Sequence, residues 1–173
     1  MLKSLLLVLL ALTSVGVCAM SLTDIGKVCL FSEMSGVLMA NGMPAANVRL
    51  VRTAKWQSEH QDETTTDADG HFHFPEMTER TVAKFLPMEF VASQSLTAFY
   101  DSSEIQIWRG IKRTSERNAE SRGTPLNVTC ELFDEEKSIT VNGGPIFSRC
   151  NWDVKPDPSE DWIWENGVGS EKD

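Results

Sequence analysis

The sequence predicts an all-β domain, and three observations indicate that fold class. Short runs rich in β-branched and aromatic residues alternate between apolar and polar positions, most cleanly over 104–108. Asn41-Gly42 stands between two strand-like runs, and this dipeptide is typical of tight β-hairpins. Residues 67–70, Asp-Ala-Asp-Gly, supply the side chains and the glycine of a second short connection. Connections of this kind join antiparallel strands.

The stretch 64–74 changes from a polar run into an alternating aromatic one. Three threonines at 64–66 suit an extended strand, and 67–70 then predicts a hairpin turn. Beyond the turn the period is two, so Phe72 and Phe74 fall on one face and two histidines fall on the other. We expect the phenylalanines to lie in the core.

The rest of the chain also has strand-length runs. A polar segment over 109–122 interrupts them and is predicted to be a long loop or a short exposed helix. The further predicted strands are 28–31, 35–39, 46–51, 81–86, 89–92, 95–100, 104–108, 126–133, 138–141 and 146–150.

The first 19 residues predict a secretory signal peptide. Lys3 precedes an apolar run over 5–12, and 17–19 ends in a small residue suited to cleavage. The run is shorter than the roughly 20 apolar residues that a transmembrane helix needs. A lipid anchor on Cys18 is the competing interpretation, which the bulk of Val17 disfavours. We expect a periplasmic or secreted protein.

Removal of this segment leaves one β-domain over 20–152 and an acidic tail over 153–173. The net charge is −9 before the loss of Lys3 makes it more negative. Nucleic acids and anionic membrane surfaces bind clustered lysine and arginine, so neither is expected as a partner.

Three cysteines remain after cleavage. Cys130 and Cys150 lie near the ends of two strand-like runs that the turn at 142–145 would bring together, so they are the most economical disulfide. Closing a loop of this size contributes about 3 kcal/mol in the chain-entropy model. Cys29 lies in an apolar run and is predicted to be a buried, inert thiol, although its pairing with either partner stays open.

Three motifs carry a resemblance to a known fold family. They are Ser-Gly-Val-Leu at 35–38, the alternating run from Gly42 to Leu50, and Thr-Asp-Ala-Asp-Gly-x-Phe-x-Phe at 66–74. In this order they resemble transthyretin-like, carboxypeptidase-regulatory-like domains, and the match covers roughly 27 to 75. The resemblance implies an antiparallel β-sandwich that serves as an accessory, adhesive or binding module. More loosely, the chain is similar to bacterial exported single-domain proteins with a C-terminal cysteine pair.

Candidate metal and catalytic sites are weak. His71 and His73 share a strand face with His60 possible nearby, but spacing fixes no third ligand, and an outward polar face explains them better. The turn at 67–70 resembles part of a calcium loop, yet Thr78 stands where that loop needs a bidentate glutamate. The sequence has no Gly-x-Ser-x-Gly elbow and no phosphate-binding glycine loop. We predict no metal, no cofactor and no catalytic residue.

Charge is segregated between two segments. The stretch 109–122 has five basic and two acidic residues, whereas 153–173 has seven acidic residues and two lysines. Two interpretations are equally supported: the segments are solvated or the tail folds back on the basic segment, or they form a protein-binding surface. Arginine and tryptophan are enriched at binding hot spots. The candidate partner-binding residues are therefore Trp108, Arg109, Arg113, Arg117, Trp162 and Trp164.

These observations predict an exported protein that binds another protein and is not an enzyme. The most concrete hypothesis is a periplasmic immunity or inhibitor protein that occludes a bacterial toxin. A carbohydrate-binding or accessory module of the cell envelope is the first alternative, favoured by Trp162 and Trp164 in the tail. A hydrolase whose site lacks a sequence motif is the second.

Overall fold

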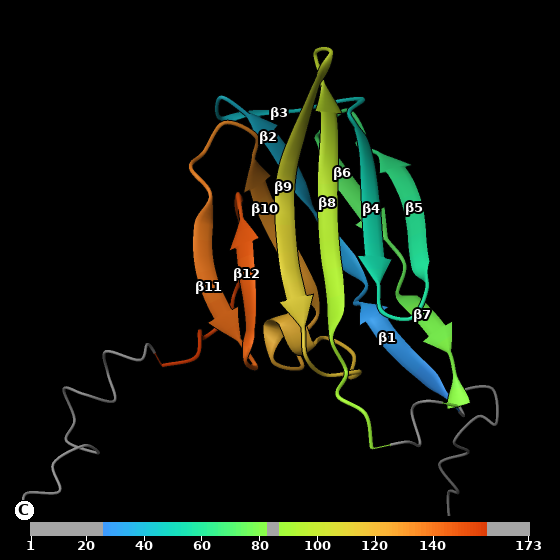
Figure 1. Ribbon diagram of the computed structural model, residues 1–173. Coiled ribbons are helices and arrows are strands. Elements are labelled where there is room, and N and C mark those ends of the chain that lie inside the picture. The colour runs from blue at the N-terminus through green and yellow to red at the C-terminus, as the bar shows by residue number, and fades with distance from the viewer. Residues whose placement is uncertain (1–25, 83–86, 159–173) are drawn as a thin grey trace, which may run out of the picture.

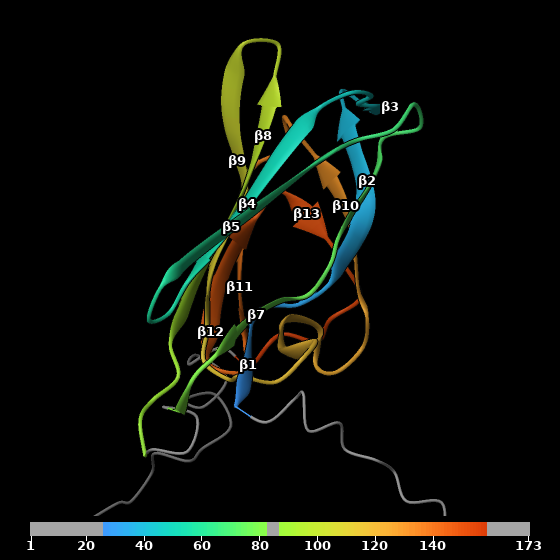
Figure 2. The same cartoon turned by 90° about the vertical axis from the view of Figure 1, so that its right-hand side faces the viewer.

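Two β-sheets face each other and enclose the core (Figures 1 and 2). The computed structural model describes residues 26–82 and 87–158. The signal peptide, Cys18, most of the acidic tail with Trp162 and Trp164, and the end of the predicted strand 81–86 lie outside the described residues. The described part of that predicted strand, Thr81 and Val82, is not in a strand.

The larger sheet has six strands in antiparallel pairs. Its order is β11 (Lys137–Val141), β12 (Gly144–Ser148), β9 (Ser103–Lys112), β8 (Ala92–Tyr100), β4 (Arg49–Lys55) and β5 (Glu59–Thr65). Figure 1 looks onto the outer face of this sheet.

The opposite sheet contains a parallel pair, which the expected antiparallel sandwich does not. Its order is β13 (Cys150–Asn151), β10 (Leu126–Glu131), β2 (Met34–Ala40) and β3 (Met43–Pro44), and β6 (His71–Phe74) also pairs with β2. β10 runs parallel to β2, and the other pairs are antiparallel. β1 (Lys27–Phe31) and β7 (Met77–Arg80) form a separate antiparallel ribbon, and residues Ala119–Ser121 form a 3₁₀ helix, η3.

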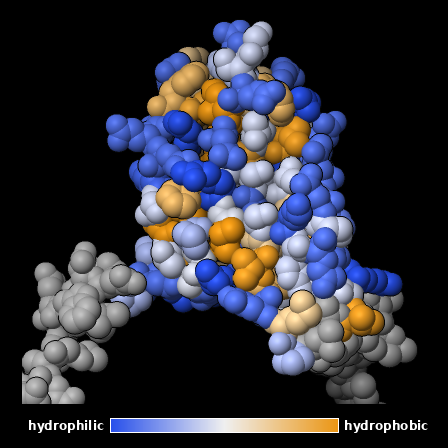
Figure 3. Space-filling model, viewed as in Figure 1, coloured by the Kyte–Doolittle hydropathy of each residue, from blue (hydrophilic) through white to orange (hydrophobic). Residues whose placement is uncertain are grey.

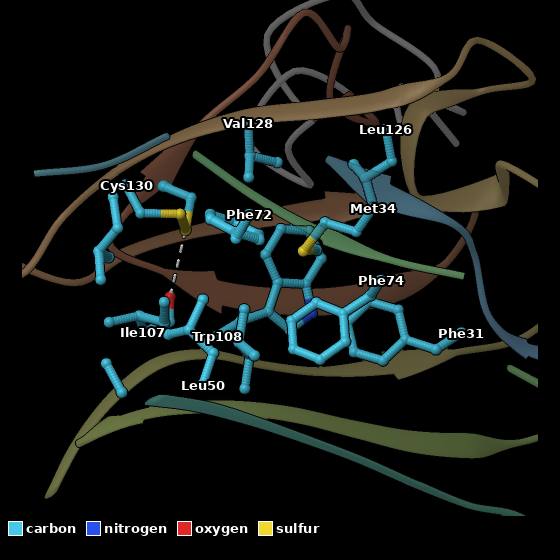
Figure 4. Close-up of a cluster of buried hydrophobic side chains, with 14 of the residues drawn as sticks. Phe31, Met34, Leu50, Phe72, Phe74, Ile107, Trp108, Leu126, Val128 and Cys130 are labelled. Carbon is cyan, nitrogen blue, oxygen red and sulfur yellow. Dashed lines mark hydrogen bonds between the residues drawn. A yellow bond between two sulfur atoms is a disulfide. The ribbon is translucent and has the colours of Figure 1, made fainter. Parts of the chain in front are cut away.

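The core lies between the two sheets. As predicted, Phe72 and Phe74 are buried and the two histidines of β6 are exposed. Figure 4 shows both phenylalanines beside Leu50 and Trp108 from the six-stranded sheet. Burying aromatic side chains of this size supplies a large share of the hydrophobic stabilisation of a small domain.

The disulfide joins two strands of the smaller sheet. The run 146–150 changes sheets after Ser148, where β12 ends, and this places Cys150 opposite Cys130 as its cross-strand neighbour. Cys130 and Cys150 are bonded, whereas Cys29 is a buried free thiol.

The two predicted turns have different outcomes. Asn41 and Gly42 both have positive φ, 53° and 76°, and join β2 to β3 in a tight hairpin. The 67–70 turn also forms, with Gly70 at φ 78°. The hairpin prediction is nevertheless wrong there, because β5 pairs with β4 in one sheet and β6 pairs with β2 in the other. The turn carries the chain across the sandwich.

A β-bulge in β9 reverses the side-chain alternation. Leu96 of β8 faces Trp108, but Thr97 faces Gln106, so Ile107 is the extra residue. Ile107 and Trp108 are consequently both buried, and Lys112 also points inward. Unbroken alternation would have placed Trp108 and Lys112 on the outer face.

Candidate functional site

Trp108 is not available to a partner. Its side chain is fully buried, with its ring 6.0 Å from that of Phe31 and 4.7 Å from that of Trp152. Its prediction as a partner-binding residue is therefore corrected, and the physical reason is the bulge, which turns it from the surface into the core.

All five basic side chains between 109 and 122 are paired within the chain. Three of the exposed arginines bind glutamates from other segments: Arg109 with Glu136 at 2.6 Å, Arg113 with Glu89 at 2.7 Å, and Arg117 with Glu76 at 2.8 Å. Arg122 pairs with Asp157, and Lys112 with Glu120. The positive charge of the segment is thus largely balanced.

The described beginning of the tail folds back on this segment. Asp157 accepts hydrogen bonds from the amides of Asn142 and Gly143, at 3.1 and 2.7 Å, as well as pairing with Arg122. Arg122 also donates to the carbonyl of Lys155 at 2.7 Å. Of the two interpretations of the charge pattern, the contacts favour internal pairing at these residues.

Beneath the basic segment lies a buried polar cluster that sequence reasoning missed. Lys112 Nζ is 3.0 Å from the Glu120 carboxylate, and both side chains are 2% exposed. Ser32 Oγ donates to the same carboxylate at 2.6 Å, and Gln94 Nε2 donates to it at 2.6 Å. Lys112 Nζ also donates to Cys29 Sγ at 3.2 Å. We call these five residues the buried cluster.

The buried cluster shifts the acidity of two of its members. Burial alone would raise the pKa of Glu120, but the Lys112 ammonium and the hydrogen bonds from Ser32 and Gln94 hold it below its ordinary range. Burial raises the pKa of Cys29 to about 11, against the opposing effect of Lys112. Cys29 is therefore a neutral thiol at physiological pH, and thiols in this state are poor nucleophiles.

The buried cluster contains the side-chain types of a catalytic site but is closed to a substrate. Catalysis requires the reacting atoms to approach within hydrogen-bond distance of a catalytic group. Lys112 and Glu120 are almost fully covered, and their hydrogen bonds are made within the chain. This arrangement is typical of a structural ion pair and does not favour the hydrolase hypothesis.

A second buried charge lies in β4. Arg52 is fully buried, forms two hydrogen bonds with Asp62 at 2.6 and 3.0 Å, and lies over the rings of Phe31 and Phe74. The sequence signal was present, because Arg52 is in phase with the buried Leu50.

The three histidines do not converge. His60 lies on β5 and contacts Glu79 at 3.1 Å, whereas His71 and His73 lie on β6 in the other sheet, where His73 contacts Ser35 at 3.0 Å. Across residues 26–82 and 87–158, no group of three or more histidine, cysteine, aspartate or glutamate side chains could hold a metal ion. No helix in this part of the chain has the length and apolar character to span a membrane.

An open groove of about 410 Å³ crosses the outer face of the six-stranded sheet. Small polar side chains line its middle, and Phe147 and Arg109 line one side. The Arg109 guanidinium lies 4.1 Å from the centre of the Phe147 ring and forms a bidentate pair with Glu136. The other accessible polar lining residues are Thr53, Lys55, Glu59, Ser93, Ser95 and Gln106.

A second accessible surface is formed by loops at one end of the sandwich. We call it the loop end and define it as residues 41–43, 67–70, 101–104 and 133–136. Both views place these loops at the end away from β1, where the described chain begins (Figures 1 and 2). Phe133 is 52% exposed there, and its ring packs edge-on against Tyr100 at 6.0 Å. Figure 3 shows hydrophobic atoms among strongly hydrophilic ones at this end.

The chain is related to a known protein family. Residues 34–135 match the family described as a domain of unknown function, DUF6795. The chain belongs to this family. The DUF6795 match begins at β2 and ends in the β10–β11 loop, so it includes Lys112, Glu120 and Phe133 but not Cys29, Ser32 or Cys150. No curated protein and no solved structure matches the chain.

Proposed function

We propose that this DUF6795 protein is an exported protein-binding domain without enzymatic activity, and most concretely a periplasmic immunity protein that occludes a bacterial toxin. The observation that carries the proposal is the half-exposed ring of Phe133 at the loop end. The sandwich that holds these loops also contains a disulfide bond within its smaller sheet. Large aromatic side chains of this kind supply much of the energy at protein interfaces. The sealed buried cluster supports a binding function over a catalytic one.

The motifs at 35–38, 42–50 and 66–74 support a transthyretin-like type of sandwich. Such domains are found as binding modules of exported proteins, which agrees with an N-terminal signal peptide and a periplasmic location. The position of the candidate site changes with the structure, because Trp108 is buried and Arg113 and Arg117 are paired with glutamates.

Survival of a bacterial host that expresses a candidate toxin tests the proposal. Each gene adjacent to this one is expressed in a bacterial host with its product directed to the periplasm, with and without this protein. We expect one product to kill the host only when the protein is absent. Survival of every strain that lacks the protein would refute the immunity function.

A pair of variants connects protection to the loop end. Phe133→Ser should abolish protection, because it removes the aromatic anchor. Met88→Ser is the matched control, since Met88 is 55% exposed but lies outside the loop end. Equal protection by both variants would place the binding site elsewhere.

A carbohydrate-binding module is the second candidate, and the groove on the six-stranded sheet favours it. Small hydroxyl and amide side chains beside an aromatic ring suit sugar hydroxyls. Glycan-array binding that disappears in Phe147→Ala but persists in Phe133→Ser would support this alternative.

A further inference from the structure

The loop end combines exposed apolar side chains with an unbalanced charge. Its four loops contain seven acidic residues, at positions 67, 69, 101, 104, 134, 135 and 136, and no lysine or arginine. Only Glu136 forms an ion pair, with Arg109, among the described residues. The basic side chains of residues 109–122 are all paired, Arg109 with Glu136 of the loop end itself, whereas the other six loop-end carboxylates have no ion-pair partner among the described residues.

We propose that the loop end binds a basic protein surface, with Phe133 as the apolar anchor and the surrounding carboxylates as the charged rim. The inference rests on the proposed function and names the chemistry of its partner. A patch of lysine and arginine side chains on the partner relieves the repulsion among the carboxylates and is drawn to them during encounter.

The apolar centre supplies the binding energy. Phe133 exposes half of its surface and is fixed against Tyr100, so little side-chain entropy is lost when a partner covers it. Met43, which is 69% exposed, lies in the neighbouring β2–β3 hairpin.

Two of the four loops are held in place by side-chain hydrogen bonds before any partner binds. The Glu131 carboxylate accepts hydrogen bonds from the amides of Asn41 and Gly42, both at 2.9 Å, and so ties the β2–β3 turn to β10. The Asp67 side chain accepts from the amides of Asp69 and His71 at 2.9 and 2.8 Å. Such preorganisation lowers the entropic cost of association.

The same charge determines which partners are excluded. Nucleic acids and anionic lipid surfaces present phosphates, which the six unpaired carboxylates repel. A neutral glycan gains nothing from the charge. A protein surface with lysine, arginine and an apolar recess matches both features of the loop end.

The experiment uses a phage-displayed library of random short peptides as the probe, selected on the immobilised mature protein. We expect the selected peptides to be enriched in lysine and arginine together with an apolar residue. The affinity of one selected peptide is then measured by calorimetry for the wild type and three variants.

The first variant reverses three exposed loop-end charges, Glu104→Lys, Asp134→Lys and Glu135→Lys, and should weaken binding by about tenfold or more. The second is matched in net charge but lies outside the loop end, Glu59→Lys, Glu116→Lys and Asp153→Lys, and should retain affinity within about twofold because screening limits distant charges. The third, Phe133→Ser, should also lose binding. Melting curves of the three variants test whether each of them folds.

Two results would overturn the inference: selected peptides without basic enrichment, or equal losses for the two triple variants. The proposed function fails separately. Basic peptides that bind the loop end without any protection from a toxin leave the inference standing and reject immunity. Protection that depends on Phe133 but survives the loop-end charge reversal leaves the proposed function standing and rejects a basic partner.

Discussion

The two ends of the sandwich differ in whether their charged side chains are paired. At the end with the basic segment, Lys112 and Glu120 are sealed together and the exposed arginines each have an acidic partner. At the loop end, six carboxylates, at positions 67, 69, 101, 104, 134 and 135, have no ion-pair partner among the described residues, and Phe133 is half exposed. Charge that is paired within the chain is not available to a partner, whereas unpaired surface charge is. The comparison therefore separates residues that hold the structure from residues that can bind.

The bulge in β9 produces the sealed end. By shifting the alternation at Ile107, it turns Lys112 toward Glu120 and places the backbone of Gly110 opposite Ile146. Without the shift, Lys112 would be solvated and Glu120 would have no cation in the core.

The largest expected effect is at the buried pair. Glu120→Gln leaves the Lys112 ammonium buried without its counter-charge, which should lower the free energy of unfolding by about 3–5 kcal/mol. Urea denaturation measures the change. Glu89→Gln is the control, because it removes the partner of an exposed arginine and should have little effect. A wild-type-like Glu120→Gln would mean that the pair is not sealed in solution.

The same pair predicts an acid dependence. The pKa of Glu120 is lowered in the folded state, from an ordinary value of 4.5, so its contribution is complete above that value and is lost as pH falls through the folded pKa. The stability gap between wild type and Glu120→Gln should therefore narrow below about pH 4.5. Urea denaturation of both proteins over a pH series measures the gap, and a constant gap would show that Glu120 does not titrate with a lowered pKa.

The crossover turn gives a smaller expected effect at the loop end. Gly70→Ala puts a side chain at φ 78°, where its Cβ would lie 2.5 Å from the Leu38 carbonyl oxygen, so we expect a loss of about 1–3 kcal/mol. Gly42→Ala has a similar φ of 76° but no atom within 4 Å, so it isolates the cost of the backbone conformation. Thermal or urea unfolding of both should show the greater loss in Gly70→Ala. Equal losses would mean that the close approach to Leu38 relaxes.

Local patterns in the sequence predicted part of this structure. The Asn41-Gly42 hairpin, the buried phenylalanines of 71–74 and the positive φ of Gly70 all follow from residues close in the chain. The pairing of strands that are distant in the chain did not follow from these local patterns. Nothing near 64–74 indicates that β5 and β6 join different sheets, because that choice depends on which strands are free to pair.

The candidate site was harder to predict, for the same reason. A one-residue bulge reverses which side chains of a strand face the core, and it leaves no signal in the sequence. The sequence pattern therefore placed Trp108 on the surface and Lys112 in a loop. The acidic partners of the arginines in the basic segment lie as far as 41 positions away along the chain. The number of charges in a segment does not predict pairs between residues so distant in the sequence.

The smallest expected effect on stability tests whether the loop end is a surface kept open for a partner. Phe133→Ser should change the free energy of unfolding by less than about 1.5 kcal/mol, because the side chain is already half exposed and its ring meets Tyr100 only edge-on. Phe74→Ala is the matched comparison: this phenylalanine is buried in the core and should cost about 3–5 kcal/mol. Urea denaturation measures both. A loss at Phe133 as large as that at Phe74 would make Phe133 part of the core, and its role would then be to hold the fold. If Phe133→Ser abolishes protection from the toxin but lowers the free energy of unfolding only slightly, this side chain contributes to binding and contributes little to the stability of the free protein.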